Sequence, residues 1–400
     1  MGRIDAAIMD GAGSRPVSRA HGAPEPALPK GRAAKDRRAA SRTTEPLATP
    51  AELRAAVPGT DTARRTVAAG REAVRRILAG KDQRLLVLVG PCSVHDEVAA
   101  LDYAGRLRAL SDRVSDTLLL VMRAYVEKPR THLGWKGLAV DPGLDGSDAL
   151  GEGLLRSRRL FTAINAMGLP VATEFVGPAT PAYLGDLVSW AAIGARTTES
   201  QTHREMASGL GCPVGFKNAT DGRLAPAING IRSARSPHQF PGLTPDGRAG
   251  RIQTAGNPRA HLVLRGGRRP NHDLQGVTEA RSALSAANLP TRLVVDCSHG
   301  NSGKDFRRQP GVLRELIGRR AGGERDIAGV MLESFLVPGK QALSAEGANL
   351  RYGQSVTDGC IGWDETEALL VDARERLRSA GKVIPFSQPE PEECLLWTGS

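Results

Sequence analysis

Short runs of consecutive apolar residues recur along the chain, and segments of mixed polar and apolar residues separate them. Runs that are apolar at successive positions, not at alternate ones, are typical of strands covered on both faces. The separating segments have helical length, which predicts parallel strands joined by helices. We interpret eight runs as strands: 84–90, 118–124, 170–175, 189–196, 213–218, 260–266, 292–300 and 328–334.

Eight such units favour an α/β protein with a (β/α)8 TIM barrel over residues 84–384. A doubly wound open sheet is the alternative, because one miscounted strand would change the architecture. Two segments fall outside the β-α rhythm. A helical pattern over residues 47–83 precedes the first strand and predicts an N-terminal helical extension for assembly or regulation. The segment His238 to Thr254 holds a Pro-Asp-Gly turn between extended pieces, which predicts an inserted β-hairpin.

The two ends of the chain differ from this middle part in composition. Residues 1–46 are mostly Ala, Arg, Pro, Gly and Ser, which predicts a disordered leader, and residues 385–400 are expected to form a flexible tail. An arginine-rich leader can resemble an organelle transit peptide, although Asp5, Asp10 and Asp36 weaken that interpretation. No apolar run has membrane-spanning length and no secretory signal is visible, so we expect a cytoplasmic protein without membrane contact.

Composition narrows the classes of partner. The chain has 400 residues and a formal net charge of +11, which suits an anionic ligand or a nucleic acid. Part of that charge lies in the leader, and aromatic residues, which stack on bases, make up only 4%. We therefore expect no nucleic-acid partner. The five cysteines are an odd number and widely spaced, which favours free thiols over disulfides.

Charged residues stand at the ends of the predicted strands. In a parallel barrel these ends converge on one mouth, where catalytic groups lie. Clustered unpaired charge costs stability unless a ligand compensates it, so the converging cations predict an anionic substrate. The strand-end residues are Cys92, Arg123, Glu174, Arg196, Lys217, Arg265, Asp296, Cys297, His299 and Glu333.

A metal site is a second inference from the same positions. Cys92, His299, Glu333 and the loop residue Asp358 offer one thiolate, one imidazole and two carboxylates. This mixed set suits a single borderline divalent ion such as Mn, Fe, Co or Zn. No local spacing motif links the four residues, and a buried structural cysteine or a hydrogen-bonded core histidine would explain two of them individually. Their common position near strand ends favours the metal site.

Six motifs closely resemble the class I 3-deoxy-D-arabino-heptulosonate 7-phosphate (DAHP) synthases of the subgroup regulated by aromatic amino acids. The resemblance extends from about residue 47 to about residue 380. It implies a barrel enzyme, a homodimer or homotetramer, that joins phosphoenolpyruvate to erythrose 4-phosphate in the shikimate pathway. The motifs are KPRTHLGWKGL (128–138), GARTTESQTHRE (194–205), CPVGFKN (212–218), LRGG (264–267), DCSHGNSGK (296–304) and YGQSVTDGCIGW (352–363).

The resemblance also implies a role for individual residues. Cys92, His299, Glu333 and Asp358 occupy the family's metal-ligand positions. The phosphoenolpyruvate positions are occupied by Arg123, Lys128, Arg196, Lys217 and Arg265, and Arg130 and Thr131 match the site for the aldose phosphate. Among the catalytic residues, which also include Cys92 and His299, we expect Lys128 to support the developing alkoxide and Glu174 to orient the attacking water.

Some positions depart from the family pattern. Cys297 stands where relatives often have Phe, and Val176-Gly177-Pro178 replaces a segment that often reads Leu-Asp-Met. Gly211 stands where phenylalanine-sensitive relatives usually have Ser. In the subgroup, the N-terminal extension and the hairpin build subunit contacts and an inhibitor pocket. We therefore expect feedback inhibition by phenylalanine, tyrosine or tryptophan, or a copy that has lost the pocket.

Two other functions stay open at this point. The same chemistry could act on another aldehyde, either an amino-sugar phosphate in a secondary pathway or arabinose 5-phosphate, although the KPRT motif argues against the latter. A catalytically silent regulatory subunit is the other alternative, and the presence of every catalytic position speaks against it.

Overall fold

The computed structural model describes residues 44–343 and 350–380. Nearly all of the predicted leader, the predicted tail and Cys394 lie outside these described residues. The chain divides into two units, Met1–Pro46 and Leu47–Ser400, and the fold given below is that of the second unit.

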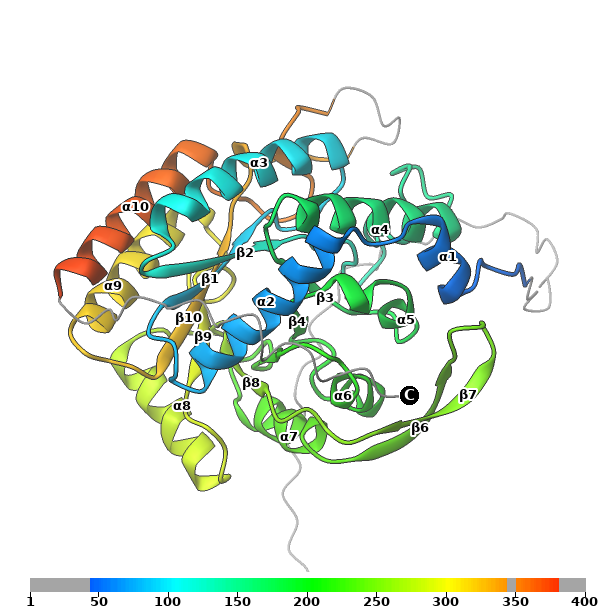
Figure 1. Ribbon diagram of the computed structural model, residues 1–400. Helices are drawn as coiled ribbons and strands as arrows, with labels where there is room; N and C mark the ends of the chain where they lie inside the picture. Colours follow the sequence, from blue (N-terminus) through cyan, green and yellow to red (C-terminus); the bar gives the residue numbers. More distant parts are fainter. Residues whose placement is uncertain (1–43, 344–349, 381–400) are drawn as a thin grey trace, which may run out of the picture. The chain divides into compact units, whose positions relative to one another are not determined.

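Eight parallel strands form a closed barrel in the order β1-β10-β9-β8-β5-β4-β3-β2 (Figure 1). The predicted TIM barrel is confirmed, and closure excludes the open-sheet alternative. Each strand lies within or close to one of the eight predicted apolar runs. Their bounds are β1 Leu85–Gly90, β2 Leu118–Arg123, β3 Val171–Glu174, β4 Trp190–Ile193, β5 Val214–Lys217, β8 Ala260–Leu264, β9 Leu293–Asp296 and β10 Ile327–Glu333.

The side chains of each strand alternate between two buried clusters. On β1, Leu86 and Leu88 belong to the smaller cluster, which fills the barrel interior. Leu85, Val87 and Val89 belong to the larger cluster, between the barrel and its helices. Both faces of the strand are therefore dry, which is the physical reason for consecutive apolar residues in the sequence.

Helices surround the barrel on its outside (Figure 1). Aspartates begin two of them: the side chain of Asp96 accepts from the backbone N–H of Val98 and Ala99, and that of Asp273 accepts from Gly276 N–H. The helices are α3 Glu97–Val114, α4 Leu150–Ala166, α5 Thr180–Leu184, α6 Gln201–Ser208, α7 Ala225–Ala234, α8 Leu274–Ala286, α9 Gln309–Ala321 and α10 Trp363–Ser379, with short 3-10 turns at Gly185–Leu187 and Phe306–Arg308.

The predicted N-terminal extension consists of α1 (Pro50–Ala56) and α2 (Asp61–Leu78). Val74 and Ile77 of α2 are fully buried and pack into the cluster of the barrel interior. The guanidinium of Arg292, just before β9, donates to Ile77 O at 2.7 Å. The helix α2 therefore covers the amino-terminal end of the barrel, opposite the mouth at which the strands end.

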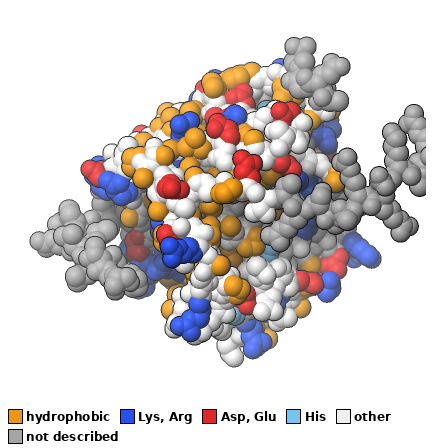
Figure 2. All heavy atoms as spheres, turned by 90° about the vertical axis from the view of Figure 1, so that its right-hand side faces the viewer, with side chains coloured by type: hydrophobic (Ala, Val, Ile, Leu, Met, Phe, Trp, Pro, Cys, Tyr) orange, Lys and Arg blue, Asp and Glu red, His pale blue; other side chains and the backbone are white. Residues whose placement is uncertain are grey.

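The predicted hairpin is confirmed as the antiparallel pair β6 (His238–Leu243) and β7 (Ala249–Thr254). Its tip contacts the N-terminal extension, because Ala51 N–H donates to Pro245 O at 2.9 Å. Figure 2 turns the right-hand side of Figure 1, where the hairpin lies, toward the viewer and shows hydrophobic side chains spread among acidic and basic ones.

Two further observations test predictions made from composition. Cys92, Cys212, Cys297 and Cys360 are buried free thiols, as predicted. Among the described residues, no helix combines the length and the apolar character needed to cross a membrane.

Candidate active site

The mouth of the barrel is lined by a layer of charged side chains directly above the apolar interior. Val121 of β2 and Ala172 of β3 belong to the interior cluster, and the next inward positions, two residues later, are Arg123 and Glu174. The other strands repeat this step from an apolar or glycine position to an ionisable one. The layer consists of Arg123, Glu174, Lys217, Arg265, Asp296 and Glu333, all of them buried.

Four predicted metal ligands converge at one side of this layer. One donor atom each from Cys92, Glu333 and Asp358 lies within 4.8 Å of the others. Cys92 follows β1, and the last residue of β1, Gly90, pairs with Glu333 at the end of β10. His299 joins them, because its Nε2 lies 3.8 Å from Glu333 Oε1. A thiolate, two carboxylates and an imidazole at this spacing could hold a divalent metal ion.

A small added sheet brings Asp358 to the group although it lies 25 residues after Glu333. After β10 the chain forms β11 (Val337–Lys340), which pairs with β12 (Gln354–Ser355). Ile361 N–H then donates to Glu333 O at 3.0 Å, which ties the Asp358 loop to the end of β10. The Gln309 amide holds Glu333 from the other side: its Nε2 donates to Glu333 O, and its Oε1 accepts from Glu333 N–H.

Lys128 lies against the thiol of Cys92, with 3.2 Å between Nζ and Sγ. Burial raises the pKa of Cys92 to about 11, and the neighbouring Glu333 adds to this, while Lys128 opposes it. Burial alone would lower the pKa of Lys128, but Cys92, Glu333 and Glu174 together raise it above its ordinary value. Lys128 is therefore an ammonium group that can donate a hydrogen bond beside the metal-donor group.

Arg123 is almost completely buried, with 1% of its surface exposed. Its Nη2 lies 3.2 Å from Glu333 Oε1, and its guanidinium stacks over the ring of Tyr125 at 4.0 Å from the centroid. Burial alone would lower the pKa of Arg123, but Tyr125, Glu333 and Asp296 raise it, so the group stays charged.

Lys217 and His299 meet at one carboxylate. Asp296 Oδ2 lies 3.0 Å from Lys217 Nζ and 2.9 Å from His299 Nδ1. Asp296 is fully buried, so these contacts are screened from water. The two predicted roles, metal ligand and phosphoenolpyruvate ligand, are thus joined through a residue to which the sequence assigned no role.

The remaining predicted substrate residues lie farther out. Arg196 is not at the end of β4 but three residues beyond Ile193, and it is exposed. Its Nε donates to Thr131 Oγ1 at 2.8 Å, which brings Arg196 to the KPRT loop. The guanidinium of Arg130 donates to Trp135 O at 2.7 Å instead. Among the described contacts, none joins Arg130 or Thr131 to the metal-donor group.

Two predicted residues depend on close backbone approach or on support from a neighbouring strand. A Cβ atom on Gly194 would lie only 2.1 Å from Glu174 Oε1, so a glycine is needed beside this carboxylate. The backbone N–H of Arg265 donates to the Asn218 side chain at 2.8 Å. Burial lowers the pKa of Arg265, and the carboxylate of Asp296 opposes that shift.

Sequence reasoning missed several residues that hold this site together. Asp296 was visible as a charged strand end, and that signal could have identified it. Ser298, Tyr125 and Gln309 carried no comparable signal, because their contacts come from turns and from a helix that follows the next loop.

Comparison with known proteins agrees with this geometry. Residues 58–371 match the family model described as the DAHP synthetase I family. The Tyr-sensitive phospho-2-dehydro-3-deoxyheptonate aldolase of Escherichia coli K12 is 51% identical over 83% of this chain and 93% of its own. The Trp-sensitive enzyme of Enterobacter agglomerans is 52% identical over 81% and 93%.

A solved structure is also similar. It is that of the phospho-2-dehydro-3-deoxyheptonate aldolase from Francisella tularensis SCHU S4, with a TM-score of 0.82 and 41% sequence identity. The match covers 85% of this chain and 99% of that one.

Proposed function

Because the chain belongs to the DAHP synthetase I family, we propose that it condenses phosphoenolpyruvate with erythrose 4-phosphate and water, giving DAHP and phosphate. One observation carries the proposal: a single barrel mouth places the donor atoms of Cys92, Glu333 and Asp358 beside buried cations. A phosphorylated, carboxylated substrate matches the cations, and an aldehyde to be polarised matches the metal-donor group.

We propose that Cys92, His299, Glu333 and Asp358 hold one divalent ion, Mn, Fe, Co or Zn. The observed donor set fits such an ion, because sulfur, nitrogen and oxygen atoms lie at ligating spacing around one point. When bound, the ion supplies Lewis-acid polarisation of the aldehyde carbonyl.

The cations would bind phosphoenolpyruvate through both of its charged ends. Arg196, Lys217 and Arg265, with Arg123 beneath them, offer bidentate and point-charge donors for one carboxylate and one phosphate. Held at both ends, the three-carbon substrate can turn only slightly, which keeps its C3 directed toward the aldehyde. Arg130 and Thr131 would bind the phosphate of erythrose 4-phosphate at the outer part of the mouth.

Lys128 and Glu174 would move or orient protons. As C3 forms its bond to the aldehyde carbon, negative charge develops on the aldehyde oxygen, and the Lys128 ammonium would donate a hydrogen bond to it. Glu174, buried in the same layer, would orient the water that adds at C2. Phosphate then leaves from the resulting hemiketal phosphate.

The activity is tested by following the loss of enolpyruvate absorbance with erythrose 4-phosphate and with other aldose phosphates. We expect turnover with erythrose 4-phosphate, loss of activity on adding a chelator, and recovery with a divalent ion. Cys92→Ala should abolish activity, whereas Cys212→Ala, which removes another buried thiol, should retain it. Turnover with a different aldose phosphate alone would replace the proposed substrate, and full activity of chelated Cys92→Ala would contradict the ligand set.

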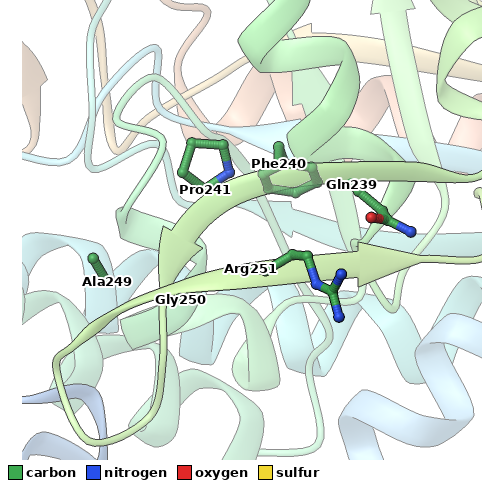
Figure 3. Close-up of a pocket in the computed structure, with 6 residues that line it drawn as sticks. All are labelled: Gln239, Phe240, Pro241, Ala249, Gly250 and Arg251. Atoms are coloured by element: carbon green, nitrogen blue, oxygen red, sulfur yellow. The ribbon is translucent and has the colours of Figure 1, made fainter.

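We further propose that the enzyme is a homodimer or homotetramer and that phenylalanine, tyrosine or tryptophan inhibits it. The hairpin supports this proposal, because an open pocket on it combines the apolar surface of Phe240 and Pro241 with the cation of Arg251 (Figure 3). An aromatic amino acid carries both a ring and a carboxylate, so this lining matches its chemistry.

Feedback is tested with saturating phenylalanine, tyrosine and tryptophan on the full chain and on a chain whose hairpin tip, residues 242–249, is replaced by Asn-Gly. Inhibition by one amino acid in the full chain only is the expected result. Indifference of the full chain to all three would leave the hairpin and α1 with a role in assembly.

A further inference from the structure

The carboxylate of Asp296 makes four contacts at the end of β9. Its Oδ2 accepts from Lys217 Nζ at 3.0 Å and lies 2.9 Å from His299 Nδ1. Its Oδ1 accepts from the backbone N–H of Ser298 at 2.9 Å and from the Ser298 hydroxyl at 2.6 Å. The side chain is fully buried, so these partners replace the water that a free carboxylate would bind.

The contact with Asp296 decides which nitrogen of His299 can bind a metal. An ionised carboxylate only accepts hydrogen bonds, so the imidazole proton lies on Nδ1 and the lone pair lies on Nε2. Nε2 faces Glu333, 3.8 Å away, on the side of the metal-donor group. His299 also has a positive φ of 56°, a conformation that a non-glycine residue keeps only when its surroundings hold it.

The turn after Asp296 supplies that hold. Lys304 N–H donates to His299 O at 2.6 Å, and Gly300 N–H donates to Arg265 O at 2.9 Å. The backbone therefore sets the position of the His299 ring, and Asp296 sets its tautomer and rotation.

Lys217 depends on the same carboxylate. Its ammonium is buried at the end of β5, and Asp296 is its one printed ion-pair partner among the described residues. Burial alone would raise the pKa of Asp296, but Lys217, His299 and Arg123 hold it well below its usual range. Asp296 is therefore an anion shared by two cationic or proton-donating side chains.

We propose that Asp296 is a positioning residue that binds His299 and Lys217 at once and thereby makes metal binding and phosphoenolpyruvate binding at this mouth cooperative. The inference rests on the proposed function, because it takes His299 and Lys217 as ligands of those two groups. It adds a coupling between them that neither ligand assignment contains.

The sign of the coupling follows from the shared oxygen. A cation at Nε2 draws electron density from the imidazole, which strengthens the Nδ1–H hydrogen bond to Oδ2. Oδ2 then attracts Lys217 less, and the ammonium can turn its charge toward an anionic substrate. Binding of the metal should raise the affinity for phosphoenolpyruvate, and linkage requires the reverse effect to be equal.

The test measures binding without turnover. Co2+ alone is titrated into the metal-free full chain and followed by its thiolate absorption band, with and without saturating phosphoenolpyruvate. Phosphoenolpyruvate alone is titrated by calorimetry, with and without Co2+. The variants are Asp296→Asn and, as a matched control, Asp326→Asn, whose carboxylate pairs with Arg281 just before β10, away from the mouth.

For Asp296→Asn we expect the Kd for Co2+ to rise by about 10–100-fold, as for other carboxylates that orient a metal-bound histidine. The Kd for phosphoenolpyruvate should also rise. The coupling factor, a typical value being about 5–150-fold, should fall at least about threefold. Direct attraction between ion and substrate is the same in both proteins, so only the difference reports on Asp296. Asp326→Asn should keep all three wild-type values.

Thermal unfolding shows whether Asp296→Asn is folded. If it is not, Ser298→Ala takes its place, because it removes one donor to Oδ1 and should weaken Co2+ binding in the same direction. A wild type that binds neither Co2+ nor phosphoenolpyruvate contradicts the proposed function. A wild type that binds both, with an unchanged coupling factor in the folded variant, overturns the inference about Asp296.

Discussion

His261 lies in the lowest layer of the barrel interior and makes two hydrogen bonds. The indole N–H of Trp190 donates to Nε2 at 3.2 Å, and Nδ1–H donates to Arg259 O at 2.9 Å. Because Nε2 is an acceptor, a second proton would break the bond to Trp190. Burial accordingly lowers the pKa of His261 from 6.5 to about 4.

This residue should make stability depend on pH. Below pH 6.5 the unfolded chain binds a proton at His261 that the folded chain refuses down to about pH 4. The free energy of unfolding should therefore fall as the pH drops through this window, by about 3 kcal/mol over its full width. Urea unfolding at pH 7 and pH 4.5 measures it, with His261→Gln as comparison. An equally steep loss in both proteins would contradict the assignment.

Two elements outside the eight β-α units have separate tasks. The hairpin β6–β7 lies beside the barrel and touches α1 at its tip. The helix α2 is part of the barrel's core, because Val74 and Ile77 pack beneath the interior side chains. Removal of residues 1–80 would therefore open the barrel floor as well as remove an extension.

The floor can be tested with one substitution. Ile77→Ala should lower the free energy of unfolding by about 2–5 kcal/mol, because the side chain is fully buried and leaves a cavity. Leu274→Ala, in which the leucine is 66% exposed on α8, should change it by less than about 0.5 kcal/mol. Chemical denaturation of both variants measures the difference, and equal effects would show that α2 is not part of the cooperative core.

On the scale of the whole molecule, the charged layer at the mouth implies that substrate binding stabilises the fold. Arg123, Lys217 and Arg265 are buried, and in the ligand-free protein their charges are compensated by Asp296 and Glu333. A trivalent or divalent anion adds the missing compensation.

We expect phosphoenolpyruvate at about 100 times its Kd to raise the free energy of unfolding by about 2.7 kcal/mol. Arg265→Met should lose most of this increment at the same ligand concentration. Arg248→Met, on the exposed hairpin tip, should keep it. Thermal unfolding with and without the ligand is the measurement, and an unchanged increment in Arg265→Met would remove that residue from the substrate site.

The sequence by itself determined the barrel, its eight strands, the N-terminal helices and the hairpin. These depend on local patterns: consecutive apolar residues for strands buried on both faces, and a Pro-Asp-Gly turn for the hairpin. It also placed the charged residues at strand ends, although the role of each site residue stays a prediction. Arg196 shows the limit of this reasoning, because the strand ends at Ile193 and the arginine lies in the following loop.

Only the tertiary structure decided which of these side chains meet. Asp358 reaches Cys92 because β11 and β12 turn the chain back to β10, and Asp296 joins Lys217 to His299 across two strand ends. The floor formed by α2 is of the same kind. A local pattern encodes the burial and the period of one segment, whereas the distance between side chains on different segments depends on how the barrel closes and how its loops return.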